Sequence, residues 1–113
     1  MDDKRTTLLP PLALAAALTL TGFAAWADEA ATLASMTKAG CTACHTKDKK
    51  LVGPSFKEIA AKYKGQADVV PKLMDKVRKG GNGVFGPVPM AATPPDKISD
   101  KDLKEAVELI LKS

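Results

Sequence analysis

The stretch Cys41-Thr42-Ala43-Cys44-His45 decides how this chain folds. Two thiols at positions i and i+3, followed at once by an imidazole, form the attachment signature of a c-type haem. Each sulfur adds to one vinyl group of the macrocycle as a thioether, and the neighbouring ring binds the iron. These are the only cysteines and the only histidine among 113 residues. The sequence therefore predicts one covalent haem c, attached through Cys41 and Cys44, with His45 as the proximal iron ligand.

Other uses of the three side chains fit the sequence less well. A redox-active dithiol of the thioredoxin kind lies beside a strand–helix–strand pattern, and no alternating apolar strand precedes Cys41. A structural zinc site needs four ligands, whereas the chain has three cysteine or histidine side chains in all. A small exported helical bundle that carries the motif by accident is the remaining alternative.

Residues 1–27 are typical of a signal peptide. Lys4 and Arg5 form a basic start, Leu12–Leu20 is an apolar run, and Ala25-Trp26-Ala27 matches a small-x-small cleavage site. An uncleaved membrane anchor over the longer run Leu8–Ala27 is the alternative, although Pro10, Pro11 and several threonines interrupt or dilute that run. Both interpretations predict export, so we expect a periplasmic protein whose mature domain is residues 28–113. Export also suits a motif that uses both thiols for haem attachment outside the cytoplasm.

Residues 28–113 show helical periodicity and no convincing strand. Apolar residues recur three and four positions apart and predict helices near residues 30–39, 56–65, 68–79 and 99–111. Gly40 is an expected left-handed stop, and Asp68 and Ser99 are expected N-caps, the latter in a capping box with Asp102. A domain this small buries only a modest core and often needs a staple. We expect an all-α fold in which four to five short helices wrap around one covalently bound haem.

Residues 80–97 are too rich in glycine and proline for regular structure, and a loop of this length indicates a function. Because His45 is the only imidazole, a second axial ligand has to be softer, and methionine is available. Met36 and Met74 lie at helical spacing among apolar residues, where methionine usually fills the core. Met90 follows Gly86-Pro87-Val88-Pro89, where prolines stiffen the backbone. Met90 is the favoured ligand, and the other two methionines remain alternatives.

Beyond the haem motif, four segments resemble small class I bacterial cytochromes c of the cytochrome c-551/c-552 type. They are Val52-Gly53-Pro54, Ile59-Ala60-Ala61-Lys62-Tyr63, Gly65-Gln66 and Gly83–Met90. The resemblance covers nearly all of residues 28–113. It implies four or five helices around the haem, axial ligation by His45 and Met90, and a Pro54 carbonyl that accepts a hydrogen bond from His45 Nδ1.

The chain departs from this family pattern around the expected haem propionates. Phe85 stands where relatives typically have tryptophan, and it has no indole N–H to donate. Lys76 stands where relatives often have arginine, and lysine is not an equivalent bidentate donor. The connector after Met90 is longer than usual and lacks the asparagine that orients the methionine sulfur in relatives. Whether Thr93 replaces that asparagine is left open.

The expected function is one-electron transfer between periplasmic redox partners, by a soluble monomer with no catalytic residue. An enzyme or gas sensor is the alternative, but it needs an open sixth position and a distal acid–base group, and the chain has no second histidine. The net charge of +4 favours partners with an acidic docking patch. Scattered lysines and few aromatic residues argue against nucleic-acid binding. We expect the haem pocket to be lined by Val52, Pro54, Ile59, Leu73 and Pro89.

Overall fold

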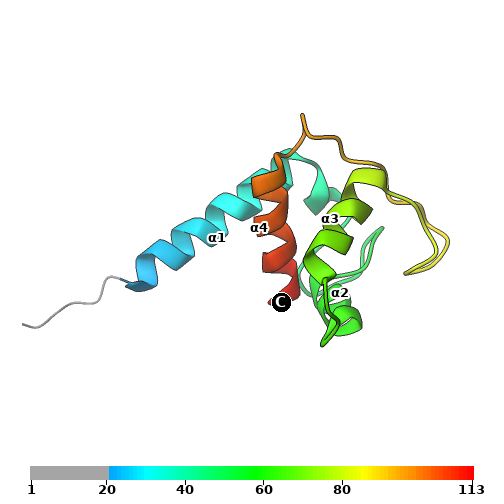
Figure 1. The fold of residues 1–113 in the computed structure, drawn as a ribbon, viewed down its shortest axis with the longest axis horizontal. Coiled ribbons are helices and arrows are strands. Elements are labelled where there is room, and N and C mark those ends of the chain that lie inside the picture. The colour runs from blue at the N-terminus through cyan, green and yellow to red at the C-terminus, as the bar shows by residue number, and fades with distance from the viewer. Residues whose placement is uncertain (1–20) are drawn as a thin grey trace, which may run out of the picture.

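The computed structural model describes residues 21–113, which form helices joined by long turns (Figure 1). The elements are α1 (Thr21–Lys38), the single 3₁₀ turn η1 (Cys41–Ala43), α2 (Phe56–Tyr63), α3 (Val69–Lys79) and α4 (Asp100–Leu111). The described part of the chain contains two isolated β-bridges and no strand. None of its helices is long and apolar enough to cross a membrane. The all-α prediction is confirmed for these residues, while most of the expected signal peptide lies outside them.

Helix α1 begins earlier than the sequence pattern indicated. It starts at Thr21 instead of near residue 30, and so runs through the expected cleavage position after Ala27. The alanine-rich composition of this region explains the difference, because alanine favours helix without needing an apolar stripe. The C-terminal end was predicted correctly: Gly40 adopts a left-handed backbone with φ of 88°. Figure 1 shows the N-terminal half of α1 reaching beyond the other helices.

Helix α2 begins with a capping box that sequence reasoning did not anticipate. The Ser55 hydroxyl accepts a hydrogen bond from the Glu58 amide at 3.1 Å, and the Glu58 carboxylate accepts one from the Ser55 amide at 2.7 Å. Ser55 is buried, so the box satisfies polar groups that water does not reach. It also fixes the backbone immediately after Pro54.

The two other predicted caps have different outcomes. Asp68 precedes α3, but its backbone is left-handed (φ 56°) and its side chain makes no capping hydrogen bond. The prediction was wrong, because a capping side chain needs an extended backbone to reach the free amides. Ser99 is extended and accepts from the Asp102 amide at 3.1 Å. Asp102 does not return the contact, which fits its side chain being one methylene shorter than glutamate.

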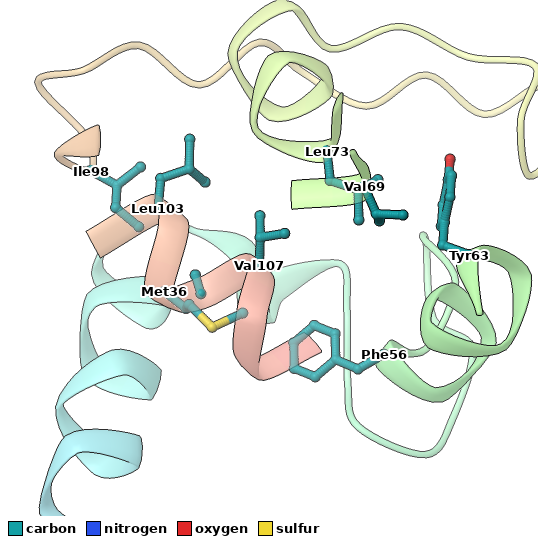
Figure 2. Close-up of a cluster of buried hydrophobic side chains, with 9 residues drawn as sticks. Met36, Phe56, Tyr63, Val69, Leu73, Ile98, Leu103 and Val107 are labelled. Atoms are coloured by element: carbon teal, nitrogen blue, oxygen red, sulfur yellow. The ribbon is translucent and has the colours of Figure 1, made fainter. Parts of the chain in front are cut away.

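The core forms where α4 packs against the other three α-helices. Figure 2 shows Met36 of α1, Phe56 of α2 and Val107 of α4 close together in one cluster. The nine buried apolar residues are Met36, Phe56, Tyr63, Val69, Leu73, Ile98, Leu103, Ala106 and Val107. This cluster holds together the elements that carry the site described below.

Replacement of a buried leucine should cost much more stability than replacement of an exposed one. Leu103 is 2% exposed and Leu51 is 50% exposed. We expect Leu103→Ala to lower the free energy of unfolding by about 2–5 kcal/mol through lost contacts and a cavity, and Leu51→Ala by about 0.5 kcal/mol or less. Guanidinium denaturation followed by circular dichroism measures both, and equal losses would contradict the core assignment.

Candidate functional site

A cavity of about 340 Å³ opens between η1, α2, α3, α4 and the loop that follows α3. Its size lies in the range of small-molecule and cofactor pockets. Both cysteines, His45 and Met90 line it, although the histidine and the methionine are 45 residues apart in sequence. Val52, Pro54, Ile59, Leu73 and Pro89 also line it, and so do Lys76 and Phe85. The structure therefore brings together the residues that the sequence favoured for the site, whereas the alternative ligand Met74 and the candidate Thr93 do not line the cavity.

The His45 ring is held by a carbonyl oxygen on one side. Its Nδ1 atom lies 2.7 Å from the Pro54 carbonyl oxygen, which is the contact that the resemblance implied. A carbonyl only accepts hydrogen bonds, so Nδ1 carries the proton and donates. In a neutral imidazole Nε2 is then left with a free lone pair, which is the state in which histidine binds a metal.

Gly53 allows the chain to pass close to this ring. A Cβ atom at Gly53 would lie 2.5 Å from His45 Cε1 and 2.9 Å from Nδ1, closer than such atoms approach in proteins. The Gly53 amide donates to the Cys44 carbonyl at 2.9 Å. On another side the Phe56 ring stacks on the imidazole, with centroids 6.2 Å apart and an interplanar angle of 25°. These contacts leave the ring little freedom to turn.

Met90 is held by backbone pairing with the end of α3. Its amide donates to the Gly81 carbonyl, and the Gly81 amide donates to the Met90 carbonyl, both at 2.9 Å. Gly80 has φ of 68°, and a Cβ atom there would clash with the Met90 carbonyl oxygen. Sequence reasoning relied on the prolines and missed this pairing; the consecutive glycines at 80 and 81 were the available signal.

The two alternative ligands, Met36 and Met74, pack in or against the core. Met36 touches the cavity, but it is 1% exposed and packs in the cluster with Phe56 and Val107 (Figure 2). Met74 packs against the same core and does not line the cavity.

The cysteine environment does not suit a redox dithiol. Burial raises the pKa of the Cys41 thiol, whereas a reactive dithiol needs a lowered pKa to expose a thiolate at neutral pH. The described residues also contain no group of three or more histidine, cysteine or acidic side chains that could hold a metal ion by themselves. Both findings weaken the dithiol and zinc alternatives.

Lysines approach the cavity at its rim. None of the ion pairs among the described residues involves Lys76. The Lys62 ammonium, from α2, lies 5.4 Å from the centroid of the Phe85 ring in the loop. Sequence reasoning did not predict this cation–π contact, because it joins residues far apart in the chain.

A family model described as Cytochrome c matches residues 27–113. The chain belongs to the cytochrome c family. Membership supports an electron carrier that binds haem c and exchanges electrons with redox partners, and such cytochromes are generally not enzymes. The prediction of a small class I cytochrome c is confirmed.

Similar proteins cover almost the whole of the predicted mature domain. Cytochrome c2 of Rubrivivax gelatinosus is 53% identical over 77 residues, which are 68% of this chain and 91% of the relative. Cytochrome c-551 of Pseudomonas aeruginosa is 39% identical over 100 residues, 88% of this chain and 91% of the relative. Among solved structures, the class 1 cytochrome MtoD of Sideroxydans lithotrophicus superposes with a TM-score of 0.66 at 33% identity, covering 75% of this chain and 95% of its own. Cytochrome c552 of Nitrosomonas europaea gives 0.62 at 39% identity, covering 70% and 95%.

The residues of this cytochrome fit a haem c. The cavity offers an imidazole with a free Nε2, a thioether and two thiols, and the rest of its wall is mainly apolar. A nitrogen and a soft sulfur are a ligand pair that haem iron takes in cytochromes c.

Gly53→Ala should disturb the His45 ring. The added methyl group has no room beside Cε1, so we expect a lower yield of haem-loaded protein and an altered haem spectrum. Gly65→Ala is the control, since Gly65 does not line the cavity and its added Cβ meets no other atom, so the change costs only the strain of a positive φ, about 1–2 kcal/mol. Haem absorbance per polypeptide, measured after expression in a host that matures cytochromes c, compares the two. A normal spectrum and yield for Gly53→Ala would contradict the close packing on His45.

Proposed function

We propose that this cytochrome is a periplasmic one-electron carrier whose haem c is attached through Cys41 and Cys44 and bound axially by His45 and Met90. The observation that carries the proposal is that His45, with Nε2 free, and Met90 line one mainly apolar cavity. When bound, haem c supplies a ferric/ferrous couple. The expected signal peptide at residues 1–27 supports the periplasmic location.

The protein tunes this couple through the residues around it. The Pro54 carbonyl, by accepting a hydrogen bond from Nδ1–H, makes Nε2 of His45 a stronger electron-pair donor to a metal. A thioether from Met90 and a wall that excludes water favour the reduced state. Because the backbone of both His45 and Met90 is hydrogen-bonded, the two side chains should move little when the iron gains or loses an electron. Lys76 would offer a positive charge to the haem propionates, whereas the Phe85 ring has no polar hydrogen to donate to them.

The cavity lacks the groups that a haem enzyme would use. Its lining contains no carboxylate and no imidazole other than His45. Peroxide chemistry needs a positioned acid or base on the open side of the iron. The described site therefore favours electron transfer over catalysis or gas sensing.

Met90→Ala should remove the distal ligand while leaving the haem attached. We expect loss of the weak near-infrared band from methionine to ferric iron, and rapid binding of carbon monoxide to the reduced protein. Optical spectra of both oxidation states measure these effects. Met74→Leu, outside the cavity, is the control and should keep the band. A band that survives in Met90→Ala would assign the ligand role to Met36 or Met74.

We also propose that partners dock at the mouth of the cavity. Four of its lining residues, Val52, Val84, Phe85 and Val88, are large and exposed. Lys50 and Lys76 line the same mouth, and Lys62 lies over Phe85. The lining carries no acidic side chain. An apolar centre with a positive edge suits brief contact with an acidic partner.

The lysines at the mouth should speed reaction with anions. We expect the rate of oxidation by ferricyanide to fall as ionic strength rises, and to be lower at low salt in Lys50→Gln and Lys62→Gln. Lys104→Gln is the control of equal net charge, since this residue is in α4 and pairs with Glu108. Stopped-flow kinetics measure the rates. Equal losses in all three variants would show that only net charge matters.

A further inference from the structure

Arg78 joins α3 to the connector that follows Met90. Its side chain is 18% exposed and does not line the cavity. One terminal nitrogen donates to the Thr93 carbonyl at 3.1 Å, and the other donates to the Ile98 carbonyl at 2.9 Å and to the Asp100 carboxylate at 2.7 Å. A single side chain therefore holds three points that lie 15 to 22 residues further along the chain.

Thr93 is held by α3 at both of its backbone groups. Its amide donates to the Val77 carbonyl at 2.9 Å, while its carbonyl accepts from Arg78. Three residues earlier, Met90 pairs with Gly81 through two backbone hydrogen bonds. Val77 and Arg78 in the last turn of α3, and Gly81 just after it, thus hold the loop at Thr93 and at Met90.

Between Met90 and the buried Ile98, the connector has few other means of staying in place. Residues 91, 92 and 94–97 are exposed, so they bury little apolar surface. Pro94 and Pro95 have no amide to donate. The Arg78 guanidinium is suited to this task because its planar fork carries five donors, whereas a lysine ammonium is a single point of charge. The three contacts replace the regular hydrogen bonding that the connector lacks.

We propose that Arg78 is a positioning residue for Met90. Its hydrogen bonds hold the connector in place, as a clasp, so that the Met90 thioether stays directed into the cavity. The inference rests on the proposed role of Met90 as an iron ligand. The two carbonyl contacts carry most of the effect, because Asp100 is 82% exposed and its ion pair with Arg78 is screened by water.

The test uses the haem-loaded protein with Arg78→Lys and Arg78→Met. Amide hydrogen exchange at Met90 and Thr93 should become about tenfold faster or more, the change expected from losing a hydrogen bond from a charged group. Exchange at Leu103 and Val107 in α4 should stay within about threefold of the parent, since the core packing of these two residues does not involve Arg78. The near-infrared methionine band should weaken, and carbon monoxide should bind the reduced protein faster.

Two control variants separate the clasp from a general effect of charge. Lys79→Gln removes a neighbouring α3 cation that forms an exposed pair with Asp75, and it should change neither exchange nor ligand binding. Asp100→Asn keeps the two carbonyl contacts and should change loop exchange less than Arg78→Lys does.

Several results would overturn the inference. Unchanged loop exchange and carbon monoxide binding in Arg78→Lys and Arg78→Met would show that no clasp exists. Equal acceleration in the loop and α4 would show that Arg78 serves the whole fold and does not position Met90. A parent protein without the methionine band would refute the proposed ligation, whereas loop exchange in the variants would still report on the clasp itself.

Discussion

The hydrogen bond between His45 Nδ1 and the Pro54 carbonyl sets the direction in which the ring faces the cavity. It settles which nitrogen is free, and it joins the haem-attachment turn to the start of α2. The surrounding contacts serve the same junction: the Gly53 amide bonds to Cys44, and the Phe56 amide bonds to Thr46 at 2.8 Å. The Ser55 capping box then fixes the next residues. Residues 41–58 therefore behave as one unit, in which a short sequence builds both the turn and the support of its histidine.

The opposite wall of the cavity is built by different means. Met90 lies in a stretch without helix or strand, and its position depends on the end of α3, through Gly81 on one side and Val77 and Arg78 on the other. The two walls are connected through the core, because α4 packs against α1, α2 and α3. A change in the core should therefore reach the site by altering the spacing of its walls. The fold positions a histidine and a methionine that its sequence places far apart.

Local patterns predicted much of this arrangement. The motif at residues 41–45 indicated haem attachment, the apolar periodicity located four helices, and Gly40 and Ser99 were correctly placed at helix ends. Local reasoning failed where another factor decided the backbone. The start of α1 depends on helix propensity without an apolar stripe, and Asp68 has a backbone that prevents capping. Arg78 could not be recognised as a clasp, because its partners become neighbours only when the connector folds back over α3.

The central claim is that His45 and Met90 are both ligands of the haem iron in the oxidised and in the reduced protein. Iron X-ray absorption of the haem-loaded protein tests it most directly, because the nearest shell distinguishes sulfur from nitrogen ligands. We predict one sulfur ligand beside the nitrogen ligands in the oxidised and reduced protein alike, and loss of that sulfur in Met90→Ala. Absence of sulfur in the parent protein, or its loss on reduction, would contradict the account.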